Sequence, residues 1–106
     1  MNKTRIIQLK KFLEESPNDP FIHYGLALEY QKSEPKMARE KYLELLERFP
    51  DYLPTYYHAA HFFWEEGEAD RTTEIFESGI ELARRQSDQN TLRELQNAYQ
   101  NFQFED

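Results

Sequence analysis

The stretch FIHYGLAL, residues 21–28, returns in kind as YYHAAHFF at residues 56–63. In both stretches, large residues flank a central pair. The first set is Phe21, Tyr24, Gly25 and Leu28, and the second is Tyr56, Ala59, Ala60 and Phe63. A looser copy follows as Leu92, Leu95, Gln96 and Tyr99. The step is about 34 to 36 residues, which is typical of a helical repeat array. Such an array presents a surface to another molecule more often than it encloses a reaction centre.

Each of the first two stretches is followed by a small residue, an aromatic four positions later and a residue where the second helix should end. These are Ala38, Tyr42 and Pro50, then Thr72, Phe76 and Arg84. The whole pattern resembles the tetratricopeptide repeat, in its small bacterial type. Between Gln31 and Lys36 the turn carries about one residue more than the repeat norm. The resemblance implies an all-α fold, in which about six helices form an array of antiparallel hairpins and a short right-handed superhelix.

The length of 106 residues indicates a single domain over residues 1–106. Within it we expect an N-terminal helix over 4–15, one repeat over 18–52, a second over 53–86 and a capping helix over 89–103. The first helix has the register of the second helix of a repeat, because Leu9 precedes Pro17 by eight residues as Tyr42 precedes Pro50. We expect its core side chains at helical spacing to be Ile6, Leu9, Phe12 and Leu13.

Composition excludes several classes of function. The formal net charge of −7 is spread along the chain, so a nucleic acid would be repelled. No apolar run approaches the roughly 20 residues that span a bilayer, so membrane insertion is not expected. Residues 1–5 lead directly into a helical pattern and predict no secretory signal. The chain has no cysteine, which excludes disulfides and thiolate metal sites. We expect a cytoplasmic protein.

The family resemblance implies that the first helix of each hairpin lines a concave groove that binds an extended peptide. By position, the predicted peptide-binding residues are Tyr30, Tyr57, His61, Trp64, Arg93 and Asn97. The residues themselves agree in part, because Tyr57 and Trp64 are seven apart and share a helix face outside the stripe of Tyr56 and Phe63. Aromatic side chains with a polar group are typical of contact surfaces. Packing against the neighbouring repeat is the alternative interpretation.

One binding mode of the family is not expected here. A clamp of Lys, Asn and Arg around a carboxylate would need Lys and Asn at positions that, in the first repeat, are occupied by Ile22 and Leu26.

Chemistry at a reaction centre is not indicated. His58, His61 and Glu65 share a helical face, but two histidines three apart are common by accident. The sequence has no Gly-rich phosphate loop and no cysteine nucleophile. We therefore expect no enzyme activity, no cofactor and no metal site.

The leading hypothesis is a non-enzymatic scaffold or adaptor that binds a peptide or protein segment in the groove. The alternative is a structural module that associates with a second copy of the chain through its terminal helices. The apolar residues available for that purpose are Ile6, Ile7, Phe12, Leu13, Phe102 and Phe104.

Overall fold

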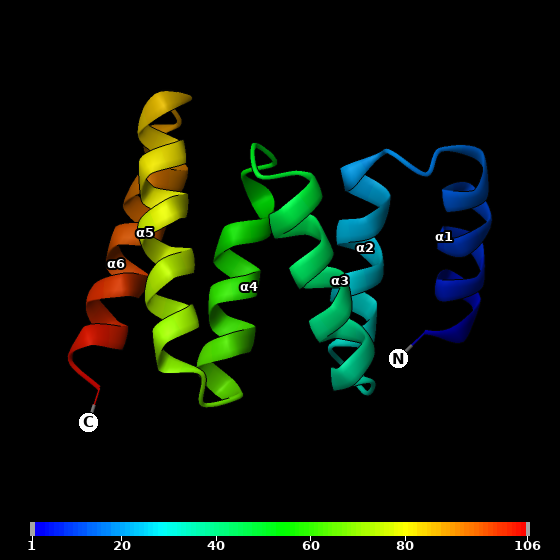
Figure 1. The fold of residues 1–106 in the computed structure, drawn as a ribbon, viewed down its shortest axis with the longest axis horizontal. Helices are drawn as coiled ribbons and strands as arrows, with labels where there is room; N and C mark the ends of the chain where they lie inside the picture. Colours follow the sequence, from blue (N-terminus) through cyan, green and yellow to red (C-terminus); the bar gives the residue numbers. More distant parts are fainter. Residues whose placement is uncertain (1, 106) are drawn as a thin grey trace. The chain divides into compact units, whose positions relative to one another are not determined.

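The chain folds into six helices in a computed structural model that describes residues 2–105. The two end residues of the predicted domain, 1 and 106, lie outside the described residues. In order the helices are α1 (Lys3–Glu15), α2 (Pro20–Tyr30), α3 (Pro35–Arg48), α4 (Pro54–Glu65), α5 (Ala69–Arg85) and α6 (Gln89–Gln103). Residues 2–105 contain no strand. The predicted all-α array of helix hairpins is confirmed (Figure 1). The right-handed superhelix, a property of the whole array, stays a prediction.

The helix boundaries follow from capping residues in the sequence. Asp19 caps α2, because its side chain accepts a hydrogen bond from the Phe21 backbone N–H, and Pro20 occupies the first helical position. Gly67 follows the end of α4 with φ 79°, a left-handed conformation that glycine adopts without steric cost. Asp88 caps α6 through the Thr91 N–H, so that helix begins at Gln89.

The chain divides into two compact units, Met1–Thr55 and Tyr56–Asp106. In the first unit, α2 contacts both α1 and α3; in the second, α5 contacts α6 (Figure 1). The boundary lies near the start of α4, close to the predicted start of the second repeat at residue 53. The single domain over residues 1–106, with its internal divisions, stays a prediction.

The helix α2 is buried on two sides. Toward α3, the His23 ring lies 5.5 Å from the Phe49 ring, and its Nδ1 accepts a hydrogen bond from Lys41 Nζ at 3.1 Å. Toward α1, Glu29 accepts the Asn2 backbone N–H and pairs with Arg5 at 3.3 Å. Burial opposes the charged form of Glu29, but hydrogen bonds from Lys32 and Asn2, together with nearby cations, outweigh it and lower the pKa of the carboxyl.

The predicted register of the first repeat is wrong by two residues. Phe21 is 62% exposed, and the buried set of α2 includes His23, Leu26, Ala27 and Tyr30. That set has the spacing of Tyr56, Ala59, Ala60 and Phe63, at a step of 33 residues. The turn after α2 spans residues 31–34 and its counterpart after α4 spans residues 66–68, so the first turn is one residue longer than the second. The error arose because Phe21 lies in the first turn of α2, where the chain has just left the Pro17–Pro20 turn and faces solvent.

Two further core predictions need correction. In α1, Ile6 and Leu9 are buried as expected, but Phe12 is 54% exposed. In α6, Gln96 is exposed, and Ala98 is buried beside Leu95. The buried residues of α1 are Ile6 and Leu9 and those of α6 are Leu95 and Ala98, a narrower stripe than the seven buried residues of α2.

Small residues set how closely neighbouring helices approach. A Cβ added at Gly79 of α5 would lie 2.7 Å from Tyr56 Cβ in α4 and 3.2 Å from Leu95 Cδ1 in α6. A Cβ added at Gly25 of α2 would lie 3.3 Å from Leu9 Cδ2, the end of a side chain that can rotate. A methyl group at Gly79 would therefore clash with Tyr56, whereas a methyl group at Gly25 would only make a close contact with Leu9.

We expect Gly79→Ala and Gly25→Ala to change stability in different ways. Alanine gains about 1 kcal/mol of helix propensity at either position. At Gly79 the overpacking against Tyr56, which costs about 1 to 3 kcal/mol, should exceed this gain and lower the free energy of unfolding by up to about 2 kcal/mol. At Gly25 a small shift of Leu9 should leave stability unchanged or raised by up to about 1 kcal/mol. Urea denaturation of both variants measures the difference, and equal midpoints would contradict the close approach at Gly79.

Candidate functional site

The second unit carries a row of half-buried aromatic rings from two helices. Its members are Tyr57, His61 and Trp64 of α4 with Tyr99 and Phe102 of α6, which we call the aromatic row. The ring centroids of Tyr57 and His61 are 4.4 Å apart, and those of His61 and Trp64 are 5.7 Å apart. The Trp64 ring meets the Phe102 ring edge to face at 5.2 Å. The row is therefore continuous from α4 to α6.

A fully buried ring of α5 packs against three rings of the row. The Phe76 ring stacks on Tyr99 at 5.4 Å and lies 6.0 Å from both His61 and Phe102. Phe76 is 0% exposed, as expected for a core aromatic. Because it contacts rings of both α4 and α6, it fixes their distance and limits their rotation.

Helical spacing explains why these side chains gather. Tyr57, His61 and Trp64 follow one another at four and three residues, so they lie along one face of α4. Tyr99 and Phe102 are three apart and share a face of α6, with ring planes 17° apart. Each helix thus presents one line of rings to the other.

The row has polar atoms that the described protein leaves available. His61 Nδ1 lies 2.8 Å from the Tyr57 carbonyl oxygen, so Nδ1–H donates and Nε2 of the neutral ring is an acceptor. Within residues 2–105, neither the Trp64 indole N–H nor the Tyr57 hydroxyl makes a hydrogen bond. The Tyr99 hydroxyl donates to Glu77 at 3.2 Å, and burial together with the Glu77 charge raises the pKa of this tyrosine. Two donors and one acceptor of the row thus have no hydrogen-bond partner among the described residues.

His58 lies beside the row on α4. Partial burial lowers the pKa of its imidazole and the neighbouring His61 acts in the same direction, whereas the charge of Glu94 on α6 opposes them. The neutral imidazole is consequently the form that the fold favours.

The structure brings together only part of the predicted binding set. Tyr57, His61 and Trp64 are adjacent in the row, whereas Arg93 and Asn97 are exposed on a face of α6 turned away from the buried Leu95 and Ala98. Tyr30 is 3% exposed and offers no surface to a ligand, so its prediction needs correction. In the corrected register Tyr30 matches the core residue Phe63, and the exposed Gln31 matches Trp64.

Two members of the row were not predicted as binding residues: Tyr99 was expected as part of the third copy of the repeat and Phe102 as apolar surface for self-association. Tyr99 and Phe102 have the spacing of a core stripe, and that spacing was the available signal. Their contact with Trp64 and Phe76 depends on how α6 packs, which no local pattern specifies.

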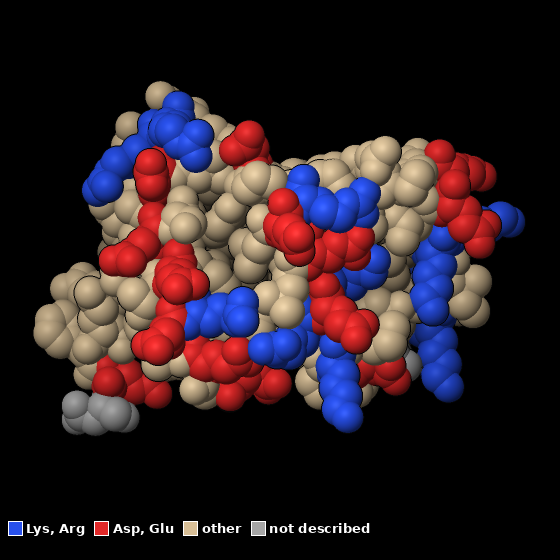
Figure 2. Space-filling view, in the orientation of Figure 1, with Lys and Arg blue, Asp and Glu red and all other residues tan. Residues whose placement is uncertain are grey.

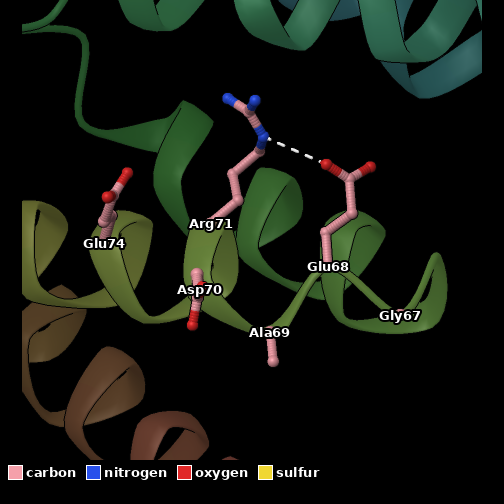
Figure 3. A pocket seen from close by; sticks show the side chains of 6 residues that line it. All are labelled: Gly67, Glu68, Ala69, Asp70, Arg71 and Glu74. Carbon is pink, nitrogen blue, oxygen red and sulfur yellow. Dashed lines mark hydrogen bonds and ion pairs between the residues drawn. The ribbon is translucent and has the colours of Figure 1, made fainter.

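Two surface depressions lie away from the aromatic row. One of about 560 Å³ at the start of α5 is lined by Gly67, Glu68, Ala69, Asp70, Arg71 and Glu74. Figure 3 shows Arg71 paired with Glu68, while Asp70 and Glu74 point in different directions. A second, of about 300 Å³, is formed by residues 33–37. Across residues 2–105, no three His, Asp or Glu side chains gather closely enough to hold a metal ion, the His58–His61 face included.

We expect the lowered pKa of His58 to make stability depend on pH. Below the ordinary histidine value of 6.5 the unfolded chain binds the proton more readily than the folded chain does, so the free energy of unfolding falls as the pH falls. His58→Gln should remove the part of this pH dependence that His58 causes. Urea titrations at about pH 7.5 and about pH 5.5 should show a smaller loss for the variant than for the parent, because carboxyl groups titrate mainly below this window. Equal losses would contradict the assignment.

The helices of residues 2–105 offer no segment with both the length and the hydropathy needed to cross a bilayer. Neither a protein-family model nor a curated protein matches the sequence. Solved structures do match it, among them a solution NMR structure and a crystal structure of a tetratricopeptide repeat domain protein from Salinibacter ruber, each with 36% identity and a TM-score of 0.77. The NMR match covers 82% of this chain and 89% of the other, and the crystal match 81% and 98%. Given this identity and coverage, the chain belongs to the tetratricopeptide repeat family.

Proposed function

We propose that this chain is a non-enzymatic scaffold or adaptor that binds an extended segment of a partner protein over the aromatic row. The observation that carries the proposal is the combination of half-exposed rings and unused polar atoms at Tyr57, His61 and Trp64. Membership of a helical repeat family supports an interaction role in general terms. We place this role in the cytoplasm.

The rings of the row are held in place by neighbouring rings, which suits them to bind a specific partner segment. Trp64 is held by Phe102, and His61 is held by both Tyr57 and the buried Phe76. Rings that are already fixed lose little side-chain entropy when a ligand covers them. Aromatic residues in such positions supply a large part of the binding energy at protein interfaces.

The exposed residues of α6 have a secondary part in the proposal. Arg93 and Asn97 carry polar groups suited to the rim of an interface, where contacts add specificity more than affinity. In the family's architecture the first helix of each hairpin faces a concave groove, and we propose that groove as the path of the bound segment. Tyr30 is left out of the binding set because it is buried.

We expect substitution of the row to weaken partner capture. In a pull-down from the native cell, Tyr57→Ala and Trp64→Ala should each retain less of a bound partner than the parent chain. Truncating a central interface aromatic typically costs at least about 2 kcal/mol, which is roughly thirtyfold in affinity. Phe21→Ala is the matched control, because this exposed ring lies outside the row.

Circular dichroism melting curves would confirm that each variant remains folded. If Tyr57→Ala and Trp64→Ala retain every partner at the parental level, the row is not the binding surface.

A second function, self-association, is favoured by three exposed apolar side chains on the terminal helices. Ile7 is 67% exposed and Phe12 54% exposed on α1, and Phe104 after α6 is 78% exposed. Ile6, which was predicted to contribute, is buried and does not. This function predicts that the sedimentation coefficient rises with protein concentration, and a constant monomer value at high concentration would contradict it.

A further inference from the structure

We infer that the segment recognised by the aromatic row is basic and proline-containing, and binds as an extended polyproline II helix. This inference rests on the proposed function and specifies the class of its partner. Three observations carry it: the spacing of the rings, the kind of polar atoms between them and the charge of the unit that bears them.

The ring spacing suits a polyproline II helix. Neighbouring rings along Tyr57, His61, Trp64 and Phe102 are 4.4, 5.7 and 5.2 Å apart. A polyproline II helix has three residues per turn and rises about 3.1 Å per residue, so residues three apart lie on one face, about 9 Å apart. Prolines at that step can lie over alternate members of the row, such as Tyr57 and Trp64, which are linked by contacts of 4.4 and 5.7 Å through His61. Surfaces lined with aromatic side chains are a general docking mode for this conformation.

The polar atoms of the row match the backbone of such a segment. Proline has no N–H, and the carbonyl groups of a polyproline II helix have no partners within it. The Trp64 indole N–H and the Tyr57 hydroxyl are donors that make no hydrogen bond within residues 2–105. Each can donate to a carbonyl of the segment. A β-strand or an α-helix would instead use its carbonyls internally or in a sheet.

The charge of the second unit favours cations in the segment. Residues 56–106 contain eleven Asp and Glu against four Lys and Arg, a formal net charge of −7, whereas residues 1–55 contain nine of each. Figure 2 shows acidic side chains following α5 over much of its length. This unit attracts basic ligands and repels acidic ones at a distance.

Acidic groups also lie close to the row itself. Glu65 is exposed directly after Trp64, and Glu94 of α6 is near enough to His58 to affect its pKa. His61 Nε2 is an acceptor that can receive an N–H from lysine or arginine. A lysine or arginine between the prolines therefore has partners of the required kind.

Three matched peptides test the inference on the full chain. The first has proline at every third position and lysine at the positions between, the second replaces each lysine by glutamate, and the third replaces each proline by glycine. Fluorescence anisotropy with a terminal dye measures their affinities. We expect the lysine–proline peptide to bind tightest. Like charge should weaken the glutamate peptide at least about tenfold. Loss of the preformed extended conformation should weaken the glycine peptide about tenfold.

A conservative variant tests the proposed donor without removing a ring. Trp64→Phe retains an aromatic ring but lacks the indole N–H, and it should weaken the lysine–proline peptide by about three- to tenfold. Phe21→Ala should bind that peptide as the parent does. Unchanged melting temperatures would show that both variants are folded.

Several outcomes would overturn the inference. They are equal or tighter binding of the glutamate peptide, equal binding of the glycine peptide, and an unchanged affinity for Trp64→Phe. Absence of binding for all three peptides also overturns it. If the pull-down still shows partners that depend on Tyr57 and Trp64, the proposed function stands and only the partner class is wrong. If it shows none, both fall.

Discussion

The aromatic row exists because Phe76 occupies the space between α4 and α6. Its ring is fully buried in α5 and contacts His61 on one side and Tyr99 and Phe102 on the other. The close approach of Gly79 to Tyr56 and Leu95 brings the three helices near enough for those contacts. Removing either feature would separate the helices that carry the row. The residues that could recognise a partner are therefore positioned by the same packing that stabilises the second unit.

Half-burial gives the row its combination of rigidity and availability. Each ring has one side against a neighbour and another side open, so its conformation is set before a ligand arrives. Some polar atoms of the row are likewise bonded within the protein and others are not. His61 Nδ1 is committed to the Tyr57 carbonyl, which leaves Nε2 and the Trp64 N–H for an external partner. Packing thus uses one face of these side chains, and the proposed binding would use the other.

The sequence predicted the second repeat better than the first, and the reason is the number of neighbours. The core pattern read for α4, with Tyr56, Ala59, Ala60 and Phe63 inward, agrees with the structure. In α2, contacts with α1 and α3 bury two faces of the helix, so apolar residues occupy many positions. Spacing alone then does not distinguish one core stripe from another. The spacing predicts Phe21 as the first large residue of the stripe, whereas His23 occupies that position with its ring against Phe49. The misplaced register carried Tyr30 into the predicted binding set.

By itself the sequence determined the helix boundaries, the repeat and the family, because capping residues, breakers such as Pro20 and Gly67, and apolar spacing act over a few residues. It also placed Tyr57, His61 and Trp64 on one helix face, since that follows from helical geometry alone. Only the tertiary structure decided that Trp64 meets Phe102, that Phe76 supports the row and that Tyr30 is buried. Those outcomes depend on which faces of distant helices pack together, and this is a property of the whole unit and not of any local pattern.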